Sequence, residues 1–505
     1  MISNFRKYHS DKNKERFNEE LIYNKGNEDI LKYLDPICRT LEIIPEINYK
    51  GATIERINKV YNFSKRVKPE PPKKEKDGKR KEKEPKREKV EIDIEESEFQ
   101  LIKLNFEIDK KDDGTVTKIE KRLFFPKLID SQYFVINNNR YYPIYQMLDS
   151  GTYRTNKALT LKTLLMPIVL REKKVSFDDS EGNTYNLMEV DLDLFKHKIP
   201  FLTYYLANFG YHETIKYFGY DDQIHLIQKE DLDLMEDNDN TVTFMITKNI
   251  ALVVNKELLE DKTHHIFVGT LMKCFNSRIK FEKIFESDYW VKKLGGNFTT
   301  NNSDKQEKGL SILLSFRRIL DDWTKEVLRT EPENKEDSYA VIRWMTKNYL
   351  DLIKQDNMNL ANKRLRLYEY LLHPLLYKFS TGTYRVLNNK TEKYRKILTI
   401  FSNIDEGFLI NKIVNNALLR YDNSVNSVSL FPLVLKYTMS GPQSPFNSNN
   451  VNDRYRGLHP SYLGRISLTS TSAGDPGVSG VLSPFLKLPE DANMHFTKKP
   501  EIELE

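Results

Sequence analysis

The sequence predicts a multidomain α+β protein, and three observations lead to this prediction. The chain is 505 residues long, which by size corresponds to roughly three domains. Two β-hairpin patterns lie close together in its first third, and helical periodicity dominates from about residue 337 to residue 420. With 39% hydrophobic and 11% aromatic residues, the chain can build several cores, so a globally disordered protein is excluded.

The first third of the chain predicts short helices and then strands. Apolar residues recur with helical spacing in DILKYLDPICRTLEII (29–44), within a first 64 residues that we expect to form helices and loops. Residues 99–111 and 115–125 alternate apolar and polar side chains on either side of Asp112-Asp113-Gly114, which predicts a hairpin. A second hairpin is predicted from residues 133–136, the turn 137–139 and residues 140–142.

The remaining segments predict an inserted mixed domain, a helical block and a loop-rich end. Between about 150 and 340, helical periodicity (194–218) alternates with strand patterns (240–254), which indicates a mixed domain. Residues from Asp337 to about Arg420 are helical in pattern, and the last 70 residues are rich in Ser, Asn, Gly and Pro.

One low-complexity insert accounts for the basic character of the chain. Residues 65–91 hold thirteen lysines and arginines against seven acidic residues, and this surplus equals the net charge of +6 of the whole chain. So many charges and four prolines cannot bury enough surface to fold alone. Two interpretations stay open, a solvated loop and a loop that contacts nucleic acid.

A second concentration of positive charge lies in the helical block. Residues 361–420 hold eleven basic residues against four acidic ones, with tyrosine and phenylalanine interleaved. This combination suits a phosphate backbone and stacked bases. A helix bundle with a solvated basic face and a tyrosine-rich core explains it equally well.

The motifs of a self-contained active site are absent from the sequence. There is no GxxxxGK[ST], GxGxxG, GxSxG or HExxH, and we name no catalytic residue. Cys38 and Cys274 are too few for a disulfide framework or a zinc cluster. The tandem His264-His265 and the acidic strings 189–193 and 231–239 fit structural and surface positions better than metal ligands, so no metal site is predicted.

No membrane association or secretion is expected from this sequence. No apolar run approaches the roughly 18 residues that span a bilayer, and the start MISNFRKYHSDKNKERF has no apolar stretch of the signal-peptide kind. We therefore expect a cytosolic, reduced protein.

Three segments, in order, resemble the β subunit of multisubunit DNA-directed RNA polymerases. RGLHPSYLGR (456–465) is similar to the family's R-x-[VL]-H-P-[ST]-H-Y-G-R, with seven of ten positions in agreement. LANKRLR (360–366) resembles L-G-N-[RK]-R-[IVL]-R, and YFVINNNR (133–140) followed by Gln146 resembles the family's hairpin G-[TS]-F-[IV]-[IV]-N-G-x-E-[KR]-V-x-x-x-Q. The chain spans the N-terminal half of such a subunit and ends 40 residues after Arg465. A β subunit split in this way resembles those of giant (jumbo) bacteriophages.

The resemblance implies a protrusion, an inserted lobe and a fork region. We expect residues 1–145 to form the first part of the protrusion, with 65–91 as a flexible insert, and residues 146–340 to form the lobe. Residues 341–430 would complete the protrusion, 431–483 would form the fork near the active centre, and 484–505 would form a tail at the split site.

The resemblance also implies residues that contact nucleic acid. SGPQSPF (440–446) weakly resembles the S-Q-L-S-Q-F segment that lines the path of nascent RNA, and arginine suits phosphate because it offers planar paired donors. For each basic residue, nucleic-acid contact and structural or subunit pairing are the two alternatives, and His459 fits a structural hydrogen-bonding role better than acid–base catalysis. The predicted nucleic-acid-binding residues are Lys363, Arg364, Arg366, Gln443, Ser444, Phe446, Arg454, Arg456, His459 and Arg465.

The family pattern further implies cofactors and partners outside this chain. Catalysis by two Mg²⁺ ions would be performed on a β′-like partner, which carries the family's carboxylate triad. Other expected partners are the C-terminal β half, a promoter-specificity factor, template and non-template DNA, and nascent RNA. The complex is expected in the cytoplasm of an infected bacterium, and packaging in the virion is left open as an alternative. A non-enzymatic DNA-binding or scaffold protein that retains a β-like fragment is the alternative, and a virion structural protein is a third.

The chain also departs from the family pattern. Tyr462-Leu463 stands where the family has His-Tyr, and Ala473 stands where it has an acidic residue. Only nine residues separate Phe446 from Arg456, so the fork loop is short and rifamycin sensitivity is not implied.

Overall fold

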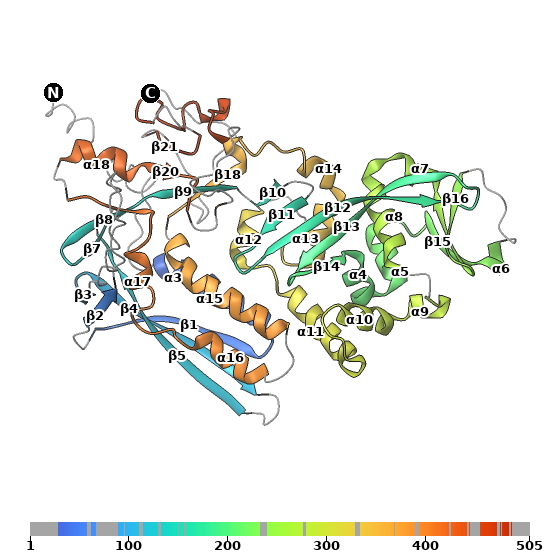
Figure 1. Cartoon of the computed structure of the whole chain (residues 1–505), viewed down its shortest axis with the longest axis horizontal. Coiled ribbons are helices and arrows are strands. Elements are labelled where there is room, and N and C mark those ends of the chain that lie inside the picture. Colours follow the sequence, from blue (N-terminus) through green and yellow to red (C-terminus); the bar gives the residue numbers. More distant parts are fainter. Residues whose placement is uncertain are drawn as a thin grey trace, which may run out of the picture.

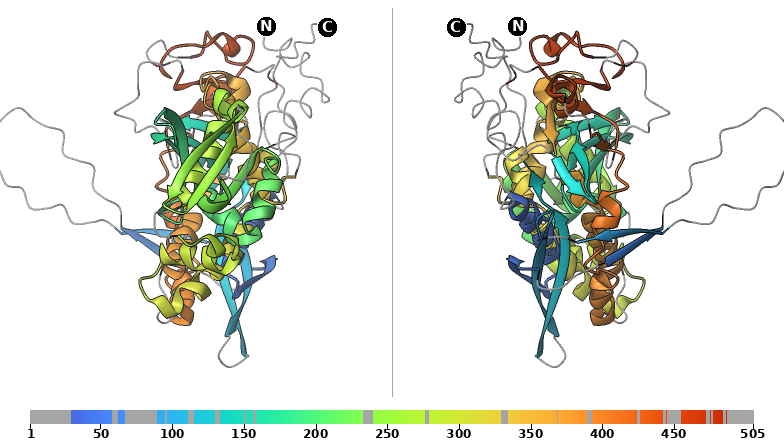
Figure 2. Two further views of the ribbon diagram at one scale, coloured as in Figure 1. Left: turned by 90° about the vertical axis from the view of Figure 1, so that its right-hand side faces the viewer. Right: turned by 90° about the vertical axis from the view of Figure 1, so that its left-hand side faces the viewer.

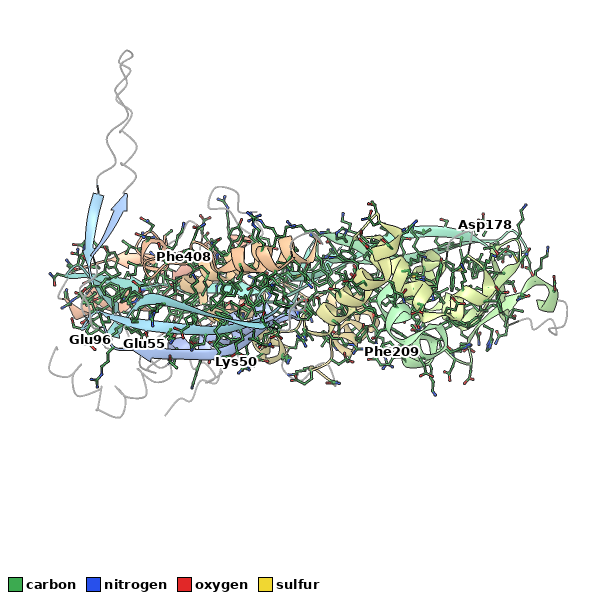
Figure 3. The ribbon with its side chains drawn as sticks, turned by 90° about the horizontal axis from the view of Figure 1, so that it is seen from below. Lys50, Glu55, Glu96, Asp178, Phe209 and Phe408 are labelled. Atoms are coloured by element: carbon green, nitrogen blue, oxygen red, sulfur yellow. The ribbon has the colours of Figure 1, made fainter. Side chains whose placement is uncertain are left out.

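The computed structural model describes most of the chain as an elongated molecule (Figures 1 and 3). Figure 3 places Glu96 near one end and Asp178 near the other. The described residues are 29–57, 62–66, 89–94, 96–110, 115–129, 133–149, 151–155, 158–232, 240–275, 279–328, 334–367, 369–388, 393–423, 426–441, 444, 455–471, 475, 477–483 and 486.

One half of the molecule is a three-stranded antiparallel sheet with helices packed on it (Figure 1). The sheet has the order β1-β4-β5, formed by Ile47–Glu55, Phe99–Lys110 and Thr115–Pro126. The long pairing of β4 with β5 confirms the first predicted hairpin. Its helices are α3 (Asp29–Arg39), η1 (Thr40–Ile43), α15 (Glu369–Leu387), α16 (Lys393–Phe401) and α17 (Ile410–Ile413).

Aromatic side chains join these helices to the sheet. The ring of Phe106 on β4 lies 6.4 Å from Phe379 of α15 and 4.8 Å from Phe401 of α16, centroid to centroid. Segments from both ends of the sequence therefore share one core. Most buried apolar residues of the chain belong to one continuous cluster, and a small second cluster surrounds Phe99 and Phe124.

Two four-stranded sheets follow the first one. The order β19-β8-β7-β6 is built from Leu419–Tyr421, Asn139–Pro143, Tyr133–Ile136 and Leu128–Ile129. The order β18-β9-β20-β21 is built from Lys363–Arg366, Tyr145–Asp149, Lys436–Thr438 and Ser479–Val481. The β7–β8 pair confirms the second predicted hairpin. Its turn residues Asn137 and Asn138 have φ of 51° and 60°, a conformation that asparagine tolerates.

Residues 151–352 form the other half of the molecule, as a mixed α and β region. A five-stranded antiparallel sheet, β10 to β14 in sequence order, comprises Thr152–Thr155, Ala158–Lys162, Pro167–Asp178, Thr184–Leu194 and His197–Pro200. A three-stranded sheet, β15-β17-β16, comprises Ile224–Gln228, Ile250–Asn255 and Thr241–Thr247. The longer helices are α4 (Leu202–Phe209), α5 (Tyr211–Phe218), α8 (Lys262–Cys274), α10 (Ser287–Gly296), α11 (Lys305–Arg317) and α13 (Ser338–Lys347). The short ones are α6 (Lys229–Leu232), α7 (Lys256–Glu260), α9 (Phe281–Phe285), η2 (Asn302–Asp304), α12 (Asp322–Val327) and α14 (Tyr349–Leu352).

A separate hairpin projects from the body of the molecule (Figures 2 and 3). It consists of β2 (Asn62–Arg66) and β3 (Lys89–Asp93), and it carries the charged insert between its strands. Most of the insert lies outside the described residues, so its predicted character stays a prediction.

Two expectations about secondary structure are wrong. Residues 47–55, expected among helices and loops, form β1, because they pair with residues 101–108 of β4. Residues 363–366, expected within the helical block, form β18 against β9. In both places tertiary pairing overrides the local pattern. The boundaries of the protrusion, lobe and fork stay predictions.

Both cysteines are buried free thiols. Burial raises the pKa of Cys274 to about 11. Among the described residues, no helix is long and apolar enough to cross a membrane.

Candidate nucleic-acid interface

The sheet β18-β9-β20-β21 contains or adjoins parts of the segments that carry the sequence resemblance, whereas the hairpin 133–140 lies in the sheet β19-β8-β7-β6. β18 is the basic end of LANKRLR, and β9 contains Gln146. β20 ends just before residues 440–446. Directly after β21, Leu482 bridges to Ile466 next to the His-Pro segment, and the N–H of Ser483 donates to the carbonyl of Arg465. Four stretches that are far apart in sequence thus meet in one small mixed sheet, which is the base of the candidate site.

Gln146 connects two of these stretches by its side-chain amide. Arg366 Nε donates to Gln146 Oε1 over 2.8 Å, and Gln146 Nε2 donates to the carbonyl of Ser440 over 3.2 Å. Gln146 is fully buried, so both bonds form out of contact with water. The amide fixes β18 relative to the start of the 440–446 segment.

Glu369 is the central anion of the buried network. It accepts two hydrogen bonds from Arg364, at 2.8 and 3.0 Å, and one from Arg366 at 3.1 Å. Burial opposes its ionisation, yet the charges of the two guanidinium groups lower the pKa of Glu369 to about 2. The carboxylate therefore stays ionised, as paired buried charges require.

Lys363, Arg364 and Arg366 are all buried, with 1–7% of their surface exposed. Lys363 pairs with Asp149 on the neighbouring strand β9, while the two arginines share Glu369. Buried ion pairs of this kind fix the geometry of a protein. These three residues lie on strand β18, and their acidic partners belong to the same chain. The structure therefore favours the alternative of structural pairing for them.

The His-Pro segment forms a short turn around η5 (Pro460–Tyr462). His459 caps this turn, because its Nδ1 accepts the backbone N–H of Ser461 at 3.2 Å and lies 2.8 Å from Ser461 Oγ. This geometry favours the structural role for His459 over acid–base catalysis.

The two arginines that bracket the turn differ in exposure. Arg465 is only 2% exposed, and its Nη1 donates to the carbonyl of Ser461 over 3.3 Å. Burial lowers the pKa of Arg465. Arg456 keeps 46% of its side chain exposed and lies 3.4 Å from the carboxylate of Asp475, which is equally exposed. Only Arg456 of this pair presents its guanidinium to solvent.

The backbone on the other side of the turn is held by Gly477. The N–H of Gly477 donates to the carbonyl of Arg456 over 3.0 Å. A Cβ at position 477 would lie 2.3 Å from Tyr455 O and 2.4 Å from Gly457 O, so only glycine allows this approach. The outer surface of the turn also exposes Leu458, Leu463 and Leu468.

The remaining predicted residues lie after β20. Ser444 is half-buried, and its N–H donates to the carbonyl of Gly441 over 3.1 Å. Gln443, Phe446 and Arg454 lie outside the described residues, so their predicted roles stay predictions.

The acidic partners of the site were missed from the sequence. Asp149, Asp356, Glu369 and Asp475 each pair with a predicted basic residue or with His459. Such pairs cannot be predicted from residue spacing, because three of the four join residues that are far apart in the sequence. Glu369 is the exception, since it follows Arg364 and Arg366 closely.

The histidine pair and the first acidic string have partners of their own. On β13, Glu189 and Asp191 pair with Lys173, and Asp193 pairs with Arg171. His264 bonds to the Tyr220 hydroxyl, and His265 bonds to the carbonyl of Leu259. In the part of the chain that the structure describes, no group of three or more His, Cys, Asp or Glu could hold a metal ion. The second string lies mostly outside that part.

Comparison with known proteins gives one family. The family described as "Non-virion RNA polymerase subunit" matches residues 5–504. No curated protein matches the chain.

Proposed function

The chain belongs to the family of non-virion RNA polymerase subunits, and from that membership we propose that it is the N-terminal half of a split, β-like subunit of a phage DNA-directed RNA polymerase. In the assembled enzyme it forms one wall of the DNA cleft and contacts template DNA and the RNA–DNA hybrid. As a polymerase subunit it works with other polymerase subunits.

The observation that carries this proposal is that the three resembling segments are joined by side-chain hydrogen bonds. Segments 133–146, 360–366 and 456–465 resemble the β subunit separately. In this structure Gln146 of the first bonds to Arg366 of the second, and Leu360 of the second bonds to Ser461 of the third, whereas the hairpin 133–143 lies in the sheet β19-β8-β7-β6. A chance resemblance of three short motifs gives no reason for them to share a hydrogen-bonded network. The exposed guanidinium of Arg456 then lies on the surface of a turn with a rigid base.

The catalytic metal ions belong to a partner chain in this proposal. The acidic residues nearest the turn, Asp356 and Asp475, already pair with His459 and Arg456. Mg²⁺ needs several free carboxylate oxygens to bridge the reacting phosphates. The C-terminal β-like half, β′-like chains and a specificity factor are the further partners proposed.

Reconstitution tests the assignment to a polymerase. The tagged chain should copurify with β′-like and C-terminal β-like chains, and the assembly should extend RNA on a primed DNA scaffold. The chain alone should not extend it. An assembly that binds DNA without extending RNA would favour the alternative, a non-enzymatic DNA-binding protein.

Site-specific crosslinking tests the surface. A photo-crosslinking residue at position 456 should react with scaffold DNA or RNA, whereas the same residue at position 39 should not. Arg39 is a matched control, because it pairs with Asp322 at 3.4 Å and is 59% exposed. Equal crosslinking at both positions would remove the turn from the nucleic-acid surface.

A further inference from the structure

A loop that begins before the LANKRLR segment lies against the His-Pro turn. It runs from Asp356 to η3 (Leu360–Asn362), and η3 continues directly into β18. The Asp356 carboxylate binds on two sides, because Oδ1 accepts the N–H of Met358 at 3.0 Å while Oδ2 lies 3.3 Å from His459 Nε2. Asp356 thus connects its own loop to the turn.

The protonation of His459 follows from its hydrogen bonds. Its Nδ1 accepts the backbone N–H of Ser461, and a nitrogen that accepts cannot carry the proton in the neutral ring. The ring proton is therefore on Nε2, which faces Asp356. A carboxylate on the second nitrogen is the usual way to fix the tautomer and orientation of an imidazole.

Ser461 supplies a second link between loop and turn. Its Oγ accepts the N–H of Leu360 over 2.9 Å. This bond and the contact between Asp356 and His459 therefore join the loop and the turn at two different places. Two links at separate points prevent rotation as well as translation of the turn. The loop itself is anchored, since Asn357 donates to the carbonyl of Arg154 on β10 and Asn362 donates to the carbonyl of Asp356.

We propose that Asp356 and Ser461 are positioning residues, which hold the Arg456-bearing turn in register with β18 and its buried network. This inference rests on the proposed function, because the turn is taken to contact the nucleic-acid scaffold. Neither residue touches nucleic acid; both act through His459 and the backbone of the turn. A displacement of about 1 Å in a positioned group is enough to cost roughly a hundredfold in rate.

The test compares four variants in the reconstituted assembly. Asp356→Ala removes the contact to His459, and Ser461→Ala removes the second link. Asp356→Asn keeps the shape and one acceptor oxygen, which can serve either His459 or the N–H of Met358 but not both. Asp351→Ala is the matched control, because Asp351 lies in the same region, is 85% exposed and pairs only loosely with Lys354 at 4.0 Å. Amide hydrogen exchange of peptides covering 455–465 reports the turn, and scaffold affinity and extension rate report the function.

We expect Asp356→Ala and Ser461→Ala to speed exchange in 455–465 and to reduce scaffold affinity by about tenfold. Asp356→Asn should restore part of both properties, because one of the two donors keeps an acceptor, and Asp351→Ala should match the wild type. If the two residues had a purely structural role, their replacement would lower the melting temperature of the chain. It would not change exchange in 455–465 and scaffold affinity together, and Asp356→Asn would not reverse such a joint change.

Three outcomes would overturn the inference. Unchanged exchange in Asp356→Ala would show that the contact does not hold the turn. Faster exchange with wild-type affinity and extension would show that the turn need not be held. Loss of the assembly in Asp356→Ala together with wild-type behaviour of Ser461→Ala would assign Asp356 to folding. If the wild-type assembly neither binds the scaffold nor extends RNA on it, the proposed function fails. The exchange experiment still shows whether Asp356 and Ser461 hold the turn.

Discussion

Arg366 and Gln146 are 220 residues apart in sequence, yet Arg366 Nε donates to Gln146 Oε1 over 2.8 Å. Both side chains are buried, and the bond closes a loop that contains the entire mixed region between them. Bringing together residues so far apart costs chain entropy, and a fold with many such non-local contacts folds slowly. The assembly of the candidate site therefore depends on complete folding of both halves of the molecule.

Gln146→Ala should destabilise the chain by about 1–3 kcal/mol, because it leaves Arg366 Nε and the Ser440 carbonyl without this partner. Urea unfolding followed by circular dichroism measures the difference. Gln100→Ala is the matched control, since Gln100 is also buried on a strand but its Oε1 accepts no hydrogen bond from the described residues. Equal losses in the two variants would contradict the importance of the bond.

The pairing of Glu369 should make stability depend on acid pH. Its folded pKa of about 2 lies below the unfolded value of 4.5, so the stabilisation is complete above pH 4.5 and disappears as the pH falls towards 2. This pKa difference corresponds to roughly 3 kcal/mol.

Glu369→Gln tests that dependence. At pH 7 it should cost about 3–5 kcal/mol, because two buried guanidinium groups lose their counter-charge. Chemical unfolding curves give the free energy of unfolding of both proteins. The difference in this free energy between the wild type and the variant should become smaller as the pH falls from 4.5 to 2. A constant gap across that range would show that Glu369 stabilises by packing and not by charge.

Local patterns predicted those elements whose partners are adjacent in sequence. Both hairpins follow from alternation around a turn, and α3 follows from the spacing of Ile30, Leu34 and Ile37. Strands β1 and β18 escaped prediction, because their partners lie about 50 and 215 residues away and nothing local reveals them.

The candidate site was predictable as a set of segments but not as a geometry. Sequence pattern identified Arg456 and Arg465 equally, whereas burial separates them. It assigned Lys363, Arg364 and Arg366 two equal alternatives, and only their acidic partners favour one of them. The exposure of a side chain depends on contacts between segments that are distant in the sequence. The local pattern of a single sequence does not reveal which segments make those contacts.

Gly477→Ala should displace the turn that carries Arg456. The added Cβ would meet two backbone oxygens within 2.4 Å, and relief of such an overlap typically costs about 1–3 kcal/mol. We expect reduced stability and weaker scaffold binding. Gly457→Ala is the control, because its Cβ would meet nothing within 4 Å. Wild-type behaviour of Gly477→Ala would show that the backbone at Gly477 can move away from the turn without loss of stability or binding.

Replacement of residues 67–88 by Asn-Gly should leave the assembly folded and active. Strands β2 and β3 pair up to Arg66 and Lys89, a register that a two-residue turn can close. The removed segment holds ten basic and six acidic residues, so DNA affinity should fall modestly at low salt. Fluorescence anisotropy measures this, and a Gly/Ser insert of equal length separates charge from length. Failure of the variant to assemble would identify the segment as a subunit contact.

Arg456→Ala should weaken the scaffold complex without affecting the fold, whereas Arg465→Ala should affect the fold first. The exposed guanidinium of Arg456 supplies charged hydrogen bonds, each typically about 1.5–3 kcal/mol, which is roughly a 10- to 150-fold loss of affinity. Loss of one phosphate contact should also reduce the salt dependence of binding by about one in log–log slope. Arg465 is buried under the turn, so its replacement should lower the melting temperature and weaken binding only through the turn.

Arg39→Ala is the control for both, because its ion pair has the same length and similar exposure. Titration of the reconstituted assembly with scaffold at several salt concentrations gives affinity and slope together, and thermal unfolding gives stability. If Arg456→Ala binds like Arg39→Ala at every salt concentration, the turn does not contact phosphate. If Arg465→Ala keeps the wild-type melting temperature but loses affinity with a reduced salt slope, then Arg465 reaches nucleic acid in the assembly. In that case Arg465 is buried only in the free chain and becomes accessible in the assembly.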